Sequence, residues 1–154
     1  QPILSPTPRL MGLDGKAKMS KSLNNHISLF EEPESLKNKI MTAVTDENRK
    51  RRSDPGNPDI CNIFALHKIF STPDEVSMID SGCRTAEIGC VDCKKILLGH
   101  AEPFICPFRE KFHALKSKPS LVYDAAKAGA EKCRPLAIET IEGAKSRLGI
   151  RHTL

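Results

Sequence analysis

Hydrophobic residues recur at helical spacing over most of the chain beyond residue 30. Residues 31–35, Glu-Glu-Pro-Glu-Ser, place a proline and acids where helices begin, and the apolar positions after them predict a helix to about residue 44. The turn-rich segment 45–58 follows, and a second helix is expected to start with Pro58. Ser-Thr-Pro-Asp-Glu at residues 71–75 predicts the capped start of a short third helix.

Two longer helical patterns fill the rest of the chain. Residues 91–116 are expected to be helical, and Pro103 and Pro107 predict a kink or a division into two segments. The last helix is expected over residues 120–148, with a bend at Pro135. It carries a stripe rich in small residues, which would let a neighbouring helix approach closely: Val122, Ala125, Gly129, Cys133, Leu136, Ile138, Ile141, Ala144 and Leu148.

The first thirty residues have a different pattern. A proline-rich approach leads to a short expected strand at residues 9–11, then to a polar loop over residues 12–26. Residues 27–30 predict a short strand or the start of a helix. Since almost everything beyond residue 30 is predicted to be helical, the fold class is mainly α, a helical module attached to the tail of another domain.

Composition narrows the class of protein. Of the 154 residues, 39% are apolar and 28% charged, as in a globular rather than a disordered chain. The net charge of +5 permits a polyanionic partner. No apolar run reaches the length of a membrane span and the first residues lack a secretory signal, so we expect a cytoplasmic protein without a membrane partner. The chain does not begin with Met and is expected to belong to a longer protein.

The stretch Lys18-Met19-Ser20-Lys21-Ser22 is the first candidate site. It follows a glycine-bearing turn at residues 12–17. Lysine ammonium groups act as point charges on phosphoryl oxygens, and hydroxyl and loop amide groups add hydrogen bonds, so such a loop can close over a polyphosphate. The alternative is a merely exposed basic turn.

Four of the six cysteines follow the pattern C-x21-C-x6-C-x2-C. The last pair would lie on one turn, and a four-thiolate shell suits zinc or an iron–sulfur cluster, which spacing alone does not separate. Buried free thiols are the alternative. Two further cysteines fall on apolar faces and are expected to be core thiols. The four are Cys61, Cys83, Cys90 and Cys93, and the two are Cys106 and Cys133.

Several further segments accompany the lysine loop at residues 18–22. They are residues 8–15 and 24–25, residues 43–46, 52–56, 61–63 and 66–67, and residues 82–86, 89–90, 92–95 and 129–132. Together these segments resemble a bacterial-type tryptophanyl-tRNA synthetase, a class I aminoacyl-tRNA synthetase. A tyrosyl enzyme shares the lysine loop, but the Thr-Asp-Pro-Gly-like segment and the cysteine pattern favour the tryptophanyl family. The resemblance runs from residue 8 to about residue 149 and corresponds to the C-terminal half of that enzyme.

The resemblance implies two domains. Residues 1–30 would be the C-terminal remnant of the Rossmann catalytic domain with its KMSKS loop, and residues 31–154 an α-helical domain of the anticodon-binding type. The family's HIGH-type ATP motif and tryptophan pocket lie in an N-terminal half that this sequence does not contain. The chain is therefore expected to be inactive alone, and a homodimer is expected only for the full-length protein.

The resemblance also implies the chemistry of the loop. In the family, tryptophan attacks the α-phosphate of MgATP, and the aminoacyl group is then transferred to tRNA(Trp). Lys18 and Lys21 would stabilise charge on the pyrophosphate leaving group. Ser20 and Ser22 would hold phosphate oxygens or fix the loop together with Met19, and the backbone of Leu10 would contact the adenine.

Some members of the family bind a [4Fe–4S] cluster through a nearly identical cysteine pattern, whose first spacing is one residue longer. We therefore predict this cluster, with Zn²⁺ as the alternative.

A basic run is predicted to contact tRNA phosphates, although most such runs are solvated loops. Lys94 and Lys95 could extend it, whereas His67, among apolar residues, is expected in the core. The predicted tRNA contacts are Arg49, Lys50, Arg51, Arg52 and Arg84. Two other functions compete: a stand-alone tRNA- or RNA-binding module with a vestigial loop, and a structural metal protein.

Overall fold

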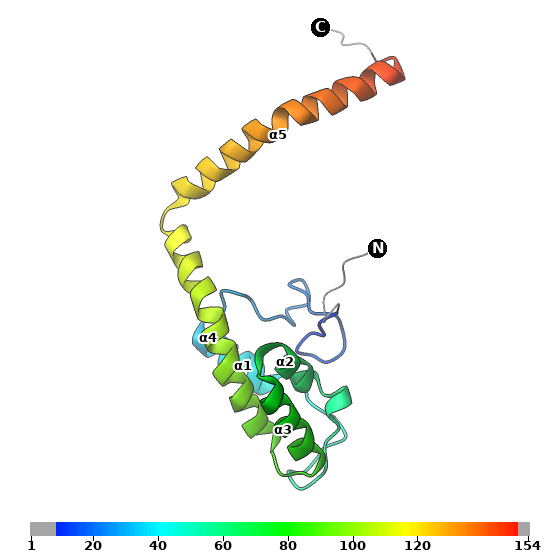
Figure 1. Ribbon diagram of the computed structural model, residues 1–154, viewed down its shortest axis with the longest axis vertical. Helices are drawn as coiled ribbons and strands as arrows, with labels where there is room; N and C mark the ends of the chain where they lie inside the picture. Colours follow the sequence, from blue (N-terminus) through cyan, green and yellow to red (C-terminus); the bar gives the residue numbers. More distant parts are fainter. Residues whose placement is uncertain (1–8, 151–154) are drawn as a thin grey trace. The chain divides into compact units, whose positions relative to one another are not determined.

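The computed structural model describes residues 9–150 (Figure 1). This part of the chain contains no β-strand, and its only strand-like pairing is an isolated antiparallel bridge between Met11 and Lys18. The mainly helical class is confirmed, while the short strand expected at residues 9–11 is reduced to that bridge. The elements are α1 (Pro33–Thr42), the 3₁₀ turn η1 (Pro58–Ile60), α2 (Asn62–Phe70), α3 (Pro73–Arg84), α4 (Cys90–Lys116) and α5 (Pro119–Leu148).

The helix starts follow the predicted signals closely. Pro33 opens α1, which ends two residues before the expected position. Pro58 begins only a single 3₁₀ turn, because the chain is extended at Cys61 and the α-helix restarts at Asn62. At the start of α3, Thr72 forms a capping box with the side chain three residues later.

Prolines do not divide the two long helices. Helix α4 continues through Pro103 and Pro107, and α5 continues through Pro135. The division of residues 91–116 into two segments was therefore wrong. All three prolines are exposed, so the carbonyl groups that lose their helical partner can be hydrated and the helix continues at a modest cost.

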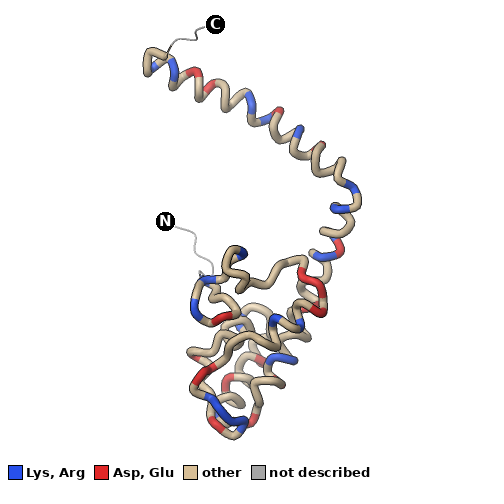
Figure 2. Tube along the Cα trace, turned by 180° about the vertical axis from the view of Figure 1, so that it is seen from behind, with Lys and Arg blue, Asp and Glu red and all other residues tan. Residues whose placement is uncertain are grey.

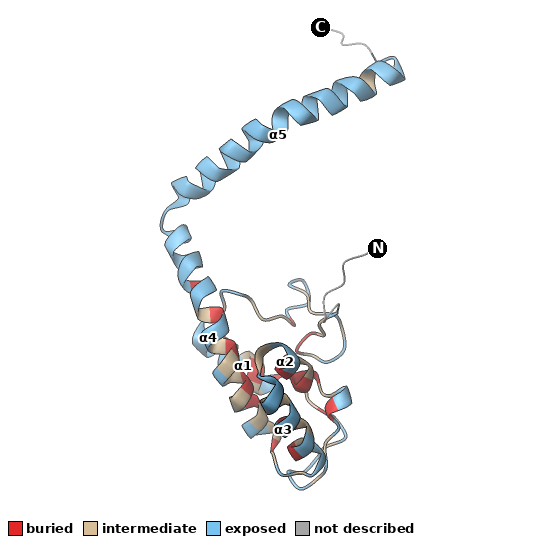
Figure 3. Ribbon diagram, viewed as in Figure 1, coloured by how far each residue is buried: buried red, intermediate tan, exposed pale blue. Residues whose placement is uncertain are grey.

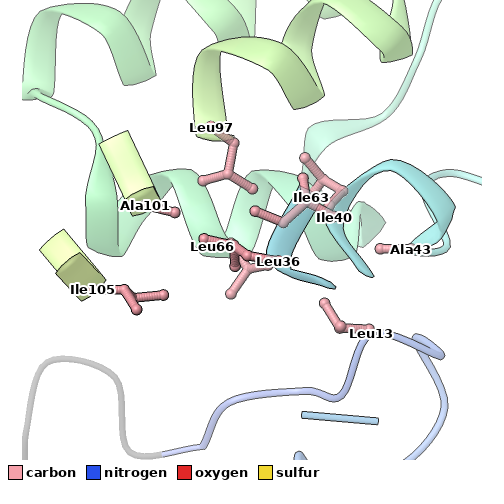
Figure 4. Close-up of a cluster of buried hydrophobic side chains, with 9 residues drawn as sticks. All are labelled: Leu13, Leu36, Ile40, Ala43, Ile63, Leu66, Leu97, Ala101 and Ile105. Atoms are coloured by element: carbon pink, nitrogen blue, oxygen red, sulfur yellow. The ribbon is translucent and has the colours of Figure 1, made fainter. Parts of the chain in front are cut away.

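The chain forms two compact units, one ending at Glu110 and the other beginning at Lys111. The hydrophobic core lies in the first unit, where α1, α2 and the first half of α4 pack around one cluster that also receives Leu13 from the N-terminal loop (Figure 4). His67 is fully buried beside it, as predicted. The clustered side chains are Leu13, Leu36, Ile40, Ala43, Ile63, Leu66, Leu97, Ala101 and Ile105.

Helix α5 buries none of its residues (Figure 3). Its apolar stripe is exposed from Val122 to Leu148, so the prediction that Cys133 is a core thiol was wrong. Cys106 in α4 is half-buried. None of the helices within residues 9–150 is long and apolar enough to cross a lipid bilayer.

Candidate functional site

The lysine loop begins as a tightly closed turn. Beside the Met11–Lys18 bridge, the amide of Met19 donates to the carbonyl of Leu10 at 2.9 Å, and the amide of Gly12 donates to the carbonyl of Ala17 at 2.8 Å. Gly15 occupies the tip with a φ of 65°, a conformation that glycine adopts without steric cost. The hydrogen bonds of this turn thus fix the backbone position of Lys18.

Asn25 closes the loop from its far end. Its side chain is 5% exposed, accepts from the Ser20 amide at 2.8 Å, and donates to the Asp14 carboxylate at 2.9 Å and the Lys18 carbonyl at 3.3 Å. The hydrogen bond from Asn25 is the largest cause of the lowered pKa of Asp14. A Cβ on Gly12 would lie 2.1 Å from the Asn25 amide nitrogen, so the close approach requires glycine.

The functional groups of the loop point outward. Lys18 and Lys21 are exposed, and within residues 9–150 neither forms an ion pair. The hydroxyl groups of Ser20 and Ser22 hydrogen-bond each other at 2.8 Å. The loop therefore presents two uncompensated ammonium groups and two hydroxyl groups on a braced backbone, an arrangement suited to phosphate oxygens.

The four patterned cysteines come from three helices. Cys61 is the N-cap residue of α2, Cys83 lies in the last turn of α3, and Cys90 and Cys93 lie in the first turn of α4. All are half-buried free thiols. Burial is the main cause, and the other three thiols a smaller one, of the raised pKa of Cys93, about 12.

The surroundings of the thiols are closely fitted. A Cβ on Gly56 would lie 2.6 Å from the Cys83 sulfur. The Arg49 guanidinium lies 3.9 Å from the Cys83 sulfur and 3.8 Å from the Cys90 sulfur, and its buried Nε has no hydrogen-bond partner in the described chain. Burial raises the pKa of the Cys83 thiol, and the nearby Arg49 cation opposes this effect only in part.

His67 completes these surroundings on the α2 side. Its Nε2 lies 3.1 Å from the Cys93 carbonyl and 3.3 Å from the Cys93 sulfur, and its Nδ1 lies 2.7 Å from the Ser71 hydroxyl. Burial is the main cause of its lowered pKa. Within the described part of the chain, however, no three His, Cys, Asp or Glu side chains are grouped as ligands of a single metal ion.

Two arginines of the basic run, residues 49–52, donate hydrogen bonds to backbone carbonyls of the protein (Figure 2 shows the run as a continuous blue stretch). Arg49 also donates to the Arg52 and Ile88 carbonyls, and Arg52 donates to the carbonyls of residues 86 and 87. Lys50 and Arg51 have exposed side chains, whereas their backbone amides donate to the Asp54 carboxylate and the Arg51 carbonyl accepts from the Asp54 amide. These two cations are thus the members available to a partner.

The three other cations that were expected near the basic run differ in their exposure and contacts. Arg84 is ion-paired with Asp59 at 2.9 Å and Asp80 at 3.1 Å. Lys94, expected to extend the basic patch, is instead 8% exposed and donates to two backbone carbonyls at the end of α1. Lys95 stays exposed next to an acidic side chain of its own helix.

Sequence reasoning missed several residues that shape the site. Asp46 is buried, and its carboxylate accepts from the Asn48 amide at 2.9 Å and the Asn57 amide at 2.8 Å, which orders the segment before η1. An Asp that starts a turn-rich stretch was a usable signal. For Asn25 and Gly56 there was no local signal, since their roles depend on groups that are distant in sequence.

A hydrogen-bonded loop that exposes Lys18 and Lys21, followed by a helical module, fits the class I aminoacyl-tRNA synthetases. The family model described as tRNA synthetases class I (W and Y) matches residues 1–102, and the chain belongs to this family.

The relatives found are tryptophan–tRNA ligases. That of Deinococcus radiodurans is 40% identical over 141 residues, covering 92% of this chain and 43% of the relative. That of Thermotoga maritima is 40% identical over 149 residues, covering 96% and 45%. A crystal structure of the Campylobacter jejuni tryptophanyl-tRNA synthetase with ADP and tryptophan matches with 30% identity and a TM-score of 0.76, covering 92% of this chain and 43% of that one. The chain thus spans less than half the length of these relatives.

Proposed function

We propose that this chain is the signature-loop and helical part of a tryptophan–tRNA ligase, which activates tryptophan with ATP and transfers it to tRNA(Trp). The observation that carries the proposal is the pair of exposed lysines, Lys18 and Lys21, on a loop braced by Asn25. The names of the relatives support the choice of tryptophan. The rest of the relatives' length would supply the remaining parts of the ATP and tryptophan sites.

The loop would act on the leaving group of the activation step. Negative charge develops on pyrophosphate as the α-phosphate is attacked, and cations already in place stabilise that transition state selectively. Lys18 and Lys21 would supply this charge together with Mg²⁺. Ser20, Ser22 and the Met19 backbone would hold phosphate oxygens or the loop itself, and the Leu10 backbone would face the adenine.

The helical part would bind tRNA. Of the predicted contacts, Lys50 and Arg51 are best supported, because their exposed side chains have no ion pair within residues 9–150. Arg49, Arg52 and Arg84 would act mainly by building the surface on which these two cations stand. Phosphate contacts of this kind set affinity and salt dependence rather than sequence preference.

The four patterned cysteines, Cys61, Cys83, Cys90 and Cys93, would hold a [4Fe–4S] cluster. The close fit of Gly56 against the Cys83 sulfur and the Arg49 cation beside two thiols support a thiolate-ligated group here. Zn²⁺ is the alternative, and the preference for the cluster rests on the cysteine spacing and the family resemblance, since no three ligands in the described residues are grouped around one ion. When bound, the cluster would cross-link the ends of three helices and could be reduced or oxidised.

A second function is a tRNA-binding module that is inactive alone, supported by the exposed cations Lys50 and Arg51. One experiment separates the two. The chain replaces the matching part of the Deinococcus ligase, and tryptophan-dependent ATP–pyrophosphate exchange is measured for the chimera and for the isolated chain. We expect exchange by the chimera alone. A folded, tRNA-binding chimera without exchange would favour the module.

A further inference from the structure

Asn62 links the cysteine region to the lysine loop. It directly follows Cys61, is 7% exposed, and donates through Nδ2 to the Gly12 carbonyl at 2.7 Å. Gly12 lies at the base of the turn that leads to Lys18, and its amide is held by the Ala17 carbonyl. The first turn of α2 and the base of the loop are therefore joined by one buried hydrogen bond.

Lys94 provides a second link from a different helix. It directly follows Cys93, and its ammonium group donates to the Met41 carbonyl at 2.9 Å and the Ala43 carbonyl at 2.7 Å. The next residue, Val44, donates its amide to the Leu13 carbonyl at 2.9 Å. The first link thus runs from the residue after Cys61 to the Gly12 carbonyl. The second runs from the residue after Cys93, through the end of α1, to the Leu13 carbonyl.

The buried side-chain amide of Asn62 indicates a role beyond packing. Its Oδ1 is buried and has no hydrogen-bond partner in the described chain. An unpaired buried acceptor is unfavourable, so an apolar side chain of similar size would pack there without that cost. The Gly12 carbonyl would still accept from the Gly15 amide at 2.9 Å. What such a replacement removes is the hydrogen bond between α2 and the base of the loop.

We propose that Asn62 and Lys94 are positioning residues that couple the four cysteines to the lysine loop, so that the arrangement of the thiols sets the arrangement of the loop. The importance of this coupling for catalysis rests on the proposed function. The coupling itself is a property of this chain, and its test requires neither a bound cluster nor aminoacylation. If the thiols influence the loop in this way, the loop must influence the thiols by the same free energy.

The first test is amide hydrogen exchange of the full 154-residue chain carrying Asn62→Leu. Amides of residues 12–25 are expected to exchange about tenfold faster, while those of α3 keep their rates, because a local hydrogen bond is lost without loss of the core. The matched control is Asn57→Ala, whose side chain caps η1 and contacts no loop residue in the described structure. Unchanged loop exchange, or a joint rise in the loop and α3, overturns the proposal.

Lys94→Met gives an independent variant that keeps the aliphatic stem. Because the ammonium group holds the end of α1, faster exchange is expected at Val44 and Leu13, again with unchanged α3. If the exchange rates of both amides stay as in the unmodified chain, Lys94 does not couple the cysteines to the loop. The two substitutions lie on different helices, so a folding defect in one leaves the other as a valid test.

The reverse direction is tested by opening the loop and probing the thiols. Asn25→Ala removes the side chain that closes the loop, and the alkylation rates of Cys61 and Cys93 by iodoacetamide are expected to rise several-fold. Cys106 is an internal reference, and its rate should not change. Unaltered rates at Cys61 and Cys93 in this variant would overturn the coupling. Absence of iron or of charging activity would instead count only against the proposed function.

Discussion

At the level of single residues, the structure distinguishes exposed side chains that are available to a ligand from buried side chains that hold the loop in place. The sequence motif predicted Lys18 and Lys21 correctly as exposed loop cations, because a short contiguous pattern contains its own evidence. It did not indicate Asn25, whose amide closes the loop, since that role depends on a contact made only in the folded chain. Likewise, the predicted basic run did not reveal that Arg49 faces two sulfurs.

Gly56 offers a residue-scale test of the cysteine cluster. Because a Cβ there would lie 2.6 Å from the Cys83 sulfur, Gly56→Ala is expected to cost about 1–3 kcal/mol of unfolding free energy. The unsubstituted protein, purified anaerobically, is expected to contain about four irons per chain. Gly56→Ala should lower this iron content. Urea unfolding and iron analysis provide the measurements.

The matched control is Gly99→Ala in α4, where an added Cβ meets nothing within 4 Å. It is expected to stabilise the helix by about 0.5–1 kcal/mol and to leave the iron content unchanged. A colourless protein, or one that contains a single zinc ion, would contradict the iron–sulfur cluster. Equal effects of the two substitutions would show that the space beside Cys83 has no special role.

At the level of elements, local signals predicted where helices begin better than how they continue. The proline and acids of α1 and the capping box of α3 are short-range patterns, and both were read correctly. The division of α4 at its prolines was wrong, because exposure to water reduces the cost of a missing hydrogen bond. The break at Cys61 was also missed, since extended backbone there sets the N-cap of α2.

The capping box of α3 gives a pH-dependent prediction. Hydrogen bonds from the Thr72 amide, from His100 and from the Thr72 hydroxyl, in that order, lower the pKa of Glu75 from 4.5 to about 2. A lowered carboxyl pKa means that its stabilising contribution is present above pH 4.5 and is lost as the pH falls toward 2. Urea unfolding of Glu75→Gln should therefore show a weaker loss of stability with pH in this window.

Two further variants define the effect. Thr72→Ala removes the cap and should cost about 1 kcal/mol at neutral pH. Glu47→Gln, at an exposed glutamate outside the helices, should keep the pH dependence of the unmodified chain. If Glu75→Gln and the unmodified chain lose stability in parallel between pH 4.5 and 2, the carboxylate does not have this role.

At the level of the whole molecule, helix content was predictable and burial was not. Periodicity predicted the small-residue stripe of α5 correctly as a helical face, but periodicity does not state what, if anything, covers such a face. The four-cysteine site stays a prediction, since no three His, Cys, Asp or Glu side chains of the described residues are grouped as ligands of one ion. The core around α1, α2 and α4 needed the structure, because helix packing depends on contacts between distant segments.

The exposure of α5 has a measurable consequence. A helix that buries no side chain lacks the tertiary packing from which most helical stability derives. In the isolated chain, amides of residues 122–146 should therefore exchange much faster than those of α2, by a factor of at least about 10². Hydrogen exchange mass spectrometry measures both in one sample. Equal protection of α5 and α2 would contradict the exposure described here.

The central claim is that Lys18 and Lys21 act on the pyrophosphate leaving group, and it is tested most directly by the kcat of ATP–pyrophosphate exchange in the Deinococcus chimera. Lys18→Ala and Lys21→Ala are each expected to lower kcat by about 10²–10³ with little change in the KM for tryptophan. Lys16→Ala, in the preceding turn, should behave as the unsubstituted chimera. A kcat that is the same in all three variants would contradict the account.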